Sequence, residues 1–535
     1  MWSLTWFLLL LVLVEGRVRL DPLVETGQGL IRGLRADDGD HSMFLGIPYG
    51  VIGDNPFGVA QPYPEFENTY EAYEDPSACP QIESGTTFGS LDCLRLNIFV
   101  PTVASSRNKL PVLVWIHGGA FNRGYTTQYN FGPRHLLKHD IIVVTLNYRL
   151  GPYGFMCLDT PDVPGNQGLK DQLLALRWIN KNIASFGGDT DKITLMGESA
   201  GSVSIEIQLL SNQEKLFSQA ILQSGAAVKP LSVIDSDLSV PLKISEQLGF
   251  RTDDVSEALT FLATADPLLV VAASYQQSID LRPCVEKEFE NVESILSDYP
   301  WNLDVPKVRD MPILNGFNER EGLTRDSTNP KDYFKKENYL KEAFKSIYNY
   351  DDNFKGMEDL VRHFYFGDEE LSEKLHEKVI DFESDFFYIY ASQWSGENLL
   401  RNGAQNVYQY MFSYDGGKNW IKNKYNITRK GAAHGDELGY LFDMVGNNMA
   451  PTEQDQLMID RITKLWTDFV KYGNPTSQTS ELIPVTWTPI TEDTINYLRI
   501  DKELSMGKRP LNERLAFWEL FFRANRQKLK GYNRD

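Results

Sequence analysis

The stretch ITLMGESAGSVS, from Ile193 to Ser204, decides the fold. An apolar run ends at Ser199, which stands between Gly197 and Gly201 in a Gly-x-Ser-x-Gly pattern. Such a pattern is common as a plain tight turn. It is also the sharp strand-to-helix turn that exposes a nucleophilic serine at the edge of a sheet. The rest of the chain distinguishes the two interpretations, because a nucleophile requires partners that a plain turn does not.

The segments around this turn alternate between expected strands and expected helices. Two apolar runs, 110–116 (LPVLVWI) and 141–146 (IIVVTL), are typical of strands buried on both faces. Apolar residues spaced by three and four predict an amphipathic helix over 169–186, and 192–196 predicts the strand before the serine. Residues 202–210 are compatible with the helix after it. We therefore expect an α/β fold with a large, mixed, mostly parallel central sheet flanked by helices.

A serine nucleophile needs a histidine to take its proton, a carboxylate to orient the histidine, and N–H donors for the oxyanion. The glycine-rich loop HGGAF, residues 117–121, directly follows the strand expected at 110–116 and provides candidate donors. Of seven histidines, four precede Ser199, against the chain order serine, acid, histidine. His376 lies in the expected charged helical surface EKLHEK, and the context of His363, LVRHFYF, favours a packing role. His434 lies among small residues in GAAHGDELGY and is the predicted base.

The acid must lie between Ser199 and His434, where acidic residues are many. The best context is ILNGFNEREG, residues 313–322, because an apolar run there ends in a turn, and catalytic loops gather at strand ends. Glu319 and Glu321 both qualify, and these observations do not choose between them.

Length and charge limit the function classes. The 535 residues carry a formal net charge of −20, which argues against nucleic acid or an anionic membrane surface as partner. Residues 1–16, MWSLTWFLLLLVLVEG, predict a secretory signal peptide, and residues 17–535 predict a single domain. No later run predicts a membrane anchor, so we expect a secreted protein. The charged segments 331–348 and 369–387 are interpreted as solvent-facing helices over the sheet.

Secretion permits disulfides and glycosylation. The four cysteines, Cys79, Cys93, Cys157 and Cys284, allow three pairings, among which the sequence does not choose. The sequon that begins at Asn426 predicts a glycosylation site. No spacing typical of metal ligands is visible, and the chemistry above needs no cofactor.

These motifs resemble the type-B carboxylesterase and cholinesterase family, most closely secreted insect carboxylesterases. The markers are LDCLRLNIFV, WIHGGAF, NYRLGPYGF, GNQGLKDQLLALRWINKNIASFGGD, GESAG, LQSG, NEREG and GAAHGDEL. The resemblance implies the α/β-hydrolase fold, with Ser199 as nucleophile, His434 as base and Glu321, not Glu319, as acid. It also implies a disulfide between Cys79 and Cys93. The implied oxyanion hole consists of the N–H groups of Gly119, Ala120 and Ala200.

Several departures from the family pattern concern the site. Ala120 stands where many members have glycine, but it keeps its N–H, so the oxyanion hole is expected to survive with less open space. No tryptophan lies between the first two cysteines, which argues against choline binding by cation–π contact. Glu198 precedes the nucleophile where juvenile hormone esterases typically have glutamine, which argues against that role. Leu231, near a position where members with a narrow acyl pocket have tryptophan, predicts a roomier pocket.

Other departures concern stability. Leu91 replaces a glutamate that usually pairs with an arginine, here Arg149, and Asp92 is the candidate replacement. The family's second disulfide has no counterpart, so the states of Cys157 and Cys284 are left open.

We therefore expect a secreted serine carboxylesterase that hydrolyses small carboxylic esters to acid and alcohol through an acyl-enzyme on Ser199. The alternatives are an esterase specialised for a hormone or an odorant, and a non-catalytic adhesion relative, which the three filled triad positions disfavour. The natural ester and the oligomeric state are left open.

Overall fold

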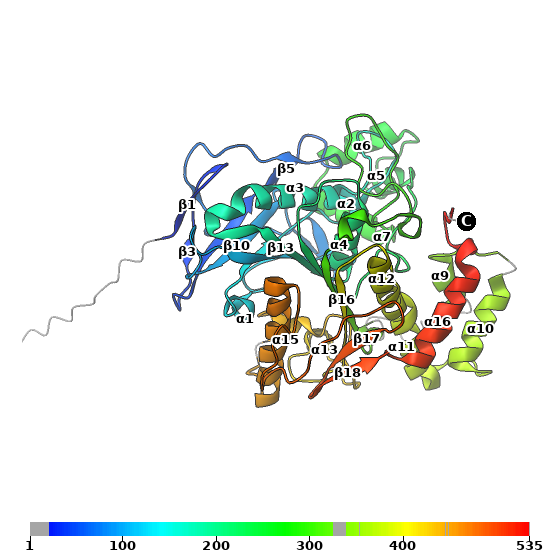
Figure 1. Ribbon diagram of the computed structural model, residues 1–535. Coiled ribbons are helices and arrows are strands. Elements are labelled where there is room, and N and C mark those ends of the chain that lie inside the picture. The colour runs from blue at the N-terminus through cyan, green and yellow to red at the C-terminus, as the bar shows by residue number, and fades with distance from the viewer. Residues whose placement is uncertain (1–20, 325–338, 352–353, 445, 448, 534–535) are drawn as a thin grey trace, which may run out of the picture.

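The computed structural model describes residues 21–324, 339–351, 354–444, 446–447 and 449–533 (Figure 1). The expected signal peptide, residues 1–16, lies outside them, as do residues 331–338 of one charged segment. Within the described parts of the chain, none of the helices combines the length and the apolarity needed to cross a bilayer.

An 11-stranded sheet forms the centre of the molecule (Figure 1). Its order is β18-β17-β16-β15-β14-β13-β11-β12-β10-β4-β3. Neighbours pair in parallel from β12 through β17, and the pairs at both edges are antiparallel. The sheet is therefore mixed and mostly parallel, as the sequence predicts. The strands are β3 (Leu34–Arg35), β4 (His41–Pro48), β10 (Arg95–Pro101), β11 (Leu110–Ile116), β12 (Ile142–Leu146), β13 (Gly188–Glu198), β14 (Gln219–Gln223), β15 (Pro312–Asn318), β16 (Asn406–Phe412), β17 (Asn496–Ile500) and β18 (Leu504–Lys508).

Helices cover both faces of the sheet, which explains why its central strands are apolar throughout. Helices α3 (Gln167–Asn182) and α4 (Ala200–Leu210) lie on one face, and α15 (Glu453–Tyr472) lies on the other (Figure 1). Strand β11 serves both layers. Val112 and Val114 belong to the core cluster that contains α3, whereas Leu113 and Trp115 belong to the cluster that contains α15.

The charged helical segments are more buried than the sequence suggests. Helices α9 (Tyr339–Lys345), α10 (Lys355–Phe366), α11 (His376–Ser384) and α16 (Asn512–Asn525) gather at one side of the molecule (Figure 1). Their apolar side chains, among them Phe344, Phe382 and Trp518, form a buried aromatic cluster. The interpretation of 331–348 and 369–387 as solvent-facing helices was therefore wrong for these inner faces, where even Glu383 and Asp385 are buried.

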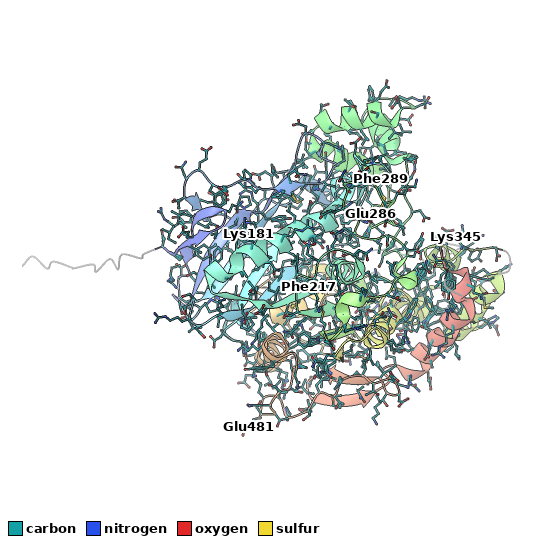
Figure 2. All side chains as sticks on the ribbon, turned by 45° about the horizontal axis from the view of Figure 1, so that its top comes forward. Lys181, Phe217, Glu286, Phe289, Lys345 and Glu481 are labelled. Atoms are coloured by element: carbon teal, nitrogen blue, oxygen red, sulfur yellow. A yellow bond between two sulfur atoms is a disulfide. The ribbon has the colours of Figure 1, made fainter. Side chains whose placement is uncertain are left out.

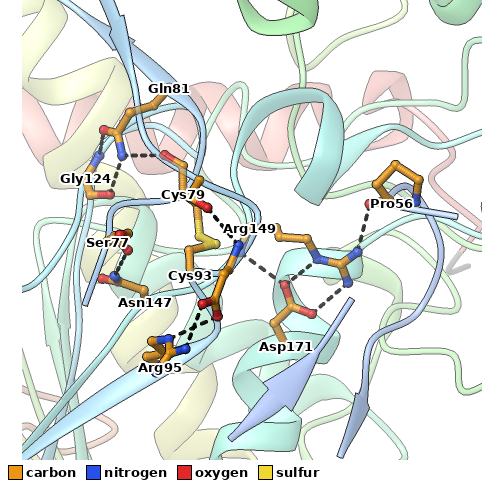
Figure 3. The surroundings of a disulfide bond; sticks show 12 residues. Pro56, Ser77, Cys79, Gln81, Cys93, Arg95, Gly124, Asn147, Arg149 and Asp171 are labelled. Carbon is orange, nitrogen blue, oxygen red and sulfur yellow. Dashed lines mark hydrogen bonds and ion pairs between the residues drawn. A yellow bond between two sulfur atoms is a disulfide. The ribbon is translucent and has the colours of Figure 1, made fainter. Parts of the chain in front are cut away.

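The expected replacement of an ion pair by Asp92 was also wrong. Arg149 is fully buried, and its Nε and Nη2 donate to Asp171 at 2.8 and 2.7 Å (Figure 3). Asp92 instead accepts from Arg95 Nε and Nη2, at 3.0 and 2.7 Å. Asp171 lies on α3 and reaches Arg149 from the helix side, a partner that the local sequence around Leu91 does not reveal.

All four cysteines are paired. Cys79 and Cys93 are bonded across the short loop that carries β8 (Gln81–Glu83) and β9 (Thr86–Phe88), as Figure 3 shows. Cys157 and Cys284 form a second bond across a sequence separation of 127, which resolves the states that the sequence left open. Near it Glu286, labelled in Figure 2, makes a buried ion pair with Lys170.

Candidate active site

Ser199 occupies a sharp turn between the end of β13 and the start of α4. Its φ of 56° and ψ of −120° lie outside the regions that a non-glycine residue usually adopts, a strain typical of functional turns. The two flanking glycines permit the turn: a Cβ on Gly197 would lie 2.5 Å from the Gly201 carbonyl carbon, and one on Gly201 would lie 2.0 Å from Ile116 O. The Gly-x-Ser-x-Gly stretch is therefore a strand-to-helix elbow and not an ordinary turn.

His434 lies in the loop between α13 (Trp420–Tyr425) and α14 (Leu438–Leu441) and faces a buried carboxylate. Its Nδ1 lies 2.6 Å from Glu321 Oε2, and Glu321 is fully buried in the turn after β15. The other carboxylate oxygen of Glu321 accepts from Asn318 N at 2.8 Å, which fixes its orientation. Glu319, the alternative acid, has a side chain that is 29% exposed and lies 3.8 Å from Arg499. Of the two glutamates, Glu321 alone contacts the imidazole.

A second carboxylate lies at the other edge of the imidazole ring. Glu198 Oε1 is 3.1 Å from His434 Nε2. Burial by itself would lower the pKa of His434, but the negative charges of Glu198 and Glu321 outweigh it and raise the pKa to about 9. For the carboxyl group of Glu198, burial has the opposite effect and raises the pKa to about 8. The ring is therefore held between two carboxyl groups that favour its protonated form.

Ser199 and His434 line one cleft of about 660 Å³. Among the residues that the structure describes, no hydrogen bond joins Ser199 Oγ to the ring, whose Nε2 faces Glu198 instead. Catalytic hydrogen bonds are often long without substrate and tighten when it binds. Aromatic side chains line much of the cleft: Tyr125, Phe131, Tyr388, Trp420 and Tyr425.

The loop after β11 places Gly119 and Ala120, two of the three residues expected to donate to the oxyanion, beside Ser199. Gly119 and Ala120 have φ values of 120° and 54°, so the backbone turns sharply beside the elbow, and both residues line the cleft with Ser199. Ala200 is the first residue of α4, where backbone N–H groups have no partner within the helix. Ala120 and Ala200 also border a smaller cavity of about 130 Å³ beside Ser199. A third cavity, of about 770 Å³ near Trp178, contains none of these residues.

Comparison with known proteins identifies the family to which this chain belongs. The model of the carboxylesterase family matches residues 20–518. The chain belongs to the carboxylesterase family. Esterase FE4 of Myzus persicae is 32% identical over 489 residues, covering 86% of this chain and 84% of that protein. Bile salt-activated lipase of Rattus norvegicus is 31% identical over 517 residues, covering 90% and 81% respectively.

A solved structure supports the fold of this carboxylesterase. The crystal structure of juvenile hormone esterase from Manduca sexta, with OTFP covalently attached, matches it with a TM-score of 0.81 and 27% identity. The match covers 94% of this chain and all of that chain. This carboxylesterase therefore has the α/β-hydrolase fold and is a carboxylic-ester hydrolase, which sets aside the non-catalytic alternative.

Two features of the carboxylesterase site were missed from the sequence. One is the contact of Glu198 with His434, because the direction of a side chain at the end of a strand cannot be read from its neighbours. The other is Glu437, which is buried and accepts from Gln223 Nε2 and Asn318 Nδ2. Burial raises the pKa of Glu437 to about 7. The motif GAAHGDEL contains Glu437, but nothing in its spacing indicates an inward side chain.

Proposed function

We propose that the protein is a secreted serine carboxylesterase that forms an acyl-enzyme on Ser199. The observation that carries the proposal is the pairing of His434 with the buried Glu321 in the cleft that Ser199 lines. A serine at a strained elbow, an imidazole in the same cleft and a carboxylate on the far ring nitrogen are the groups that nucleophilic ester hydrolysis requires.

In the proposed reaction, Ser199 Oγ attacks the ester carbonyl carbon while His434 Nε2 takes its proton. Glu321 holds the Nδ1 side of the ring and stabilises its charged form. The C–O bond to the alcohol then breaks, and His434 gives its proton to the departing oxygen. Water attacks the acyl-enzyme by the same route and releases the acid. The developing oxyanion accepts from the N–H groups of Gly119, Ala120 and Ala200.

The initial test is the replacement of Ser199 by alanine. We expect turnover of p-nitrophenyl butyrate to fall by a factor on the order of 10⁶, because removal of a triad nucleophile leaves only binding and the oxyanion hole. Ser204→Ala is the matched control, since Ser204 lies on the same helix and its hydroxyl donates to Ala200 O. Activity of Ser199→Ala equal to that of Ser204→Ala would contradict the mechanism.

Secretion is part of the proposal. Two disulfides, an expected signal peptide and an exposed sequon asparagine, Asn426 at the end of α13 (Trp420–Tyr425), support it. Expression in insect cells is expected to give enzyme in the medium whose mass falls after N-glycosidase treatment and is unaffected in Asn426→Gln. Retention of all activity inside the cells would contradict secretion.

A further inference from the structure

The smaller cavity beside Ser199, called here the acyl cavity, has a distinct chemical character. Among the described residues that line it, Lys229 and Arg282 are cationic and none is acidic. We infer that the acyl cavity selects esters whose acyl group ends in a carboxylate, and that Arg282 recognises that carboxylate. The inference rests on the proposed function and names its substrate class.

Geometry decides which part of an ester enters this cavity. In the proposed reaction the departing alcohol oxygen takes its proton from His434, so the alcohol lies on the side of the large cleft, which His434 lines. His434 does not line the acyl cavity, whereas Ser199, Ala120 and Ala200 do. The acyl substituent, on the other side of the carbonyl carbon, therefore points into the acyl cavity.

The size of the cavity favours a short acyl chain. Its volume is about 130 Å³. A water molecule occupies about 30 Å³ in the liquid, so the cavity holds about four groups of that size. A chain of two methylene groups that ends in a carboxylate matches this space, and the carboxylate then lies among the cavity's cations.

Arg282 has hydrogen-bonding capacity left for such a ligand. Its side chain is 17% exposed; Nε contacts Asp280 Oδ1 at 2.5 Å, and Nη1 donates to Leu231 O at 2.8 Å. Its Nη2 has no hydrogen-bond partner among the residues that the structure describes. A guanidinium fixed at two nitrogens presents the third in a defined direction, which is the geometry that suits carboxylate recognition.

The segment that carries Arg282 is fixed in place. Leu231, whose carbonyl accepts from Arg282, has a φ of 62°, a left-handed conformation that is strained for leucine. Close by, Ile234 N donates to Pro283 O at 2.9 Å. The disulfide between Cys284 and the distant Cys157 anchors the same segment. A recognition group on a rigid support loses little conformational entropy when it binds.

Lys229 adds positive potential at the reacting centre. Its Nζ lies 4.8 Å from the centre of the Tyr388 ring, and both residues line the acyl cavity. Burial, the largest influence on both groups, lowers the pKa of His434 and raises the pKa of Glu198, whereas the positive charge of Lys229 lowers both. A carboxylate in the acyl cavity therefore lies in a field that is locally positive, although the whole chain is acidic.

The test compares monomethyl succinate with methyl succinamate, which has the same shape but carries a neutral amide in place of the carboxylate. Methanol release gives kcat/KM for each ester. We expect the wild-type enzyme to prefer monomethyl succinate by about 10-fold or more, the value of one charge-assisted hydrogen bond. In Arg282→Gln, kcat/KM for monomethyl succinate is expected to fall by about 10- to 100-fold, with less than about a 3-fold change for methyl succinamate.

Two controls separate the possible outcomes. Arg251→Gln removes the same charge from a side chain that is 85% exposed and is expected to change neither rate, and Arg282→Lys is expected to restore part of the preference. Turnover of methyl succinamate by Arg282→Gln reports that the fold is intact. This inference alone is overturned if an organophosphate labels Ser199 but the enzyme does not prefer monomethyl succinate. It is also overturned if the preference survives in Arg282→Gln. Absence of both turnover and labelling in the wild-type enzyme instead overturns the proposed function.

Discussion

Replacing Glu198 with glutamine is expected to make the enzyme active at lower pH. His434 must be neutral to take the proton of Ser199, and its pKa is raised to about 9 because the charges of Glu198 and Glu321 outweigh the effect of burial. The kcat/KM of the wild-type enzyme should therefore rise with pH until about pH 9. Glutamine keeps the shape of the side chain but removes the charge nearest to Nε2.

The magnitude follows from the 3.1 Å between Glu198 Oε1 and His434 Nε2. With an effective dielectric constant of about 20, two unit charges at this distance attract by about 5 kcal/mol, and one pKa unit corresponds to 1.36 kcal/mol. If Glu198 and His434 were both fully charged, their attraction would raise the pKa of His434 by about four units. The net shift of the His434 pKa is smaller because burial of the imidazole, the largest influence, opposes the two negative charges. Glu198, whose pKa burial raises to about 8, is also only partly charged near neutral pH. Glu321 and Lys229 stay in place, so we expect a decrease of about one to two units.

The assay is kcat/KM for p-nitrophenyl butyrate between pH 5 and pH 10, with the release of p-nitrophenol corrected for its own ionisation. The acid limb of the profile for Glu198→Gln is expected to lie about one to two pH units below that of the wild type. Glu319→Gln is the matched control, because that carboxylate lies beside Arg499 and away from the imidazole. An acid limb that stays in place or moves to higher pH in Glu198→Gln would refute the electrostatic account of His434.

Two further changes test the scaffold. Asp171→Asn leaves the fully buried Arg149 without its counter-charge and is expected to lower the free energy of unfolding by about 3–5 kcal/mol. Urea titration of tryptophan fluorescence measures this loss, and a loss below about 1 kcal/mol would contradict the expectation. Gly201→Ala places a Cβ 2.0 Å from Ile116 O and is expected to abolish soluble, active enzyme, measured as soluble yield and turnover of p-nitrophenyl butyrate. Wild-type yield and activity would show that the elbow tolerates a side chain.

The sheet was predictable because its central strands have apolar residues on both faces. The run at 110–116 became β11 with the same bounds, and the run at 141–146 became β12 one residue shorter, Ile142–Leu146. The elbow was also predictable, although Gly-x-Ser-x-Gly alone is common in plain turns, because the pattern lies between an expected strand and an expected helix and occurs together with the upstream loop HGGAF. Such local patterns depend only on neighbouring residues.

Long-range pairings were not predictable from local patterns. Nothing near Arg149 indicates that its partner is Asp171 on α3, and no spacing indicates that Cys157 bonds with Cys284. Such pairs depend on how distant segments pack, which the chain around each residue does not encode. The choice of acid illustrates the same limit: position in a turn left Glu319 and Glu321 equal, and the structure separates them by burial and by the distance to His434.

The most direct test of the central claim is the identification of the residue that an organophosphate modifies. After incubation with diethyl p-nitrophenyl phosphate, peptide mass spectrometry is expected to find one diethylphosphoryl group, on Ser199, with one equivalent of p-nitrophenol released. Modification is expected to be absent in Ser199→Ala and slower by a factor on the order of 10³ or more in His434→Gln. A phosphoryl group on another residue, or ester turnover that continues with Ser199 unmodified, would contradict the account.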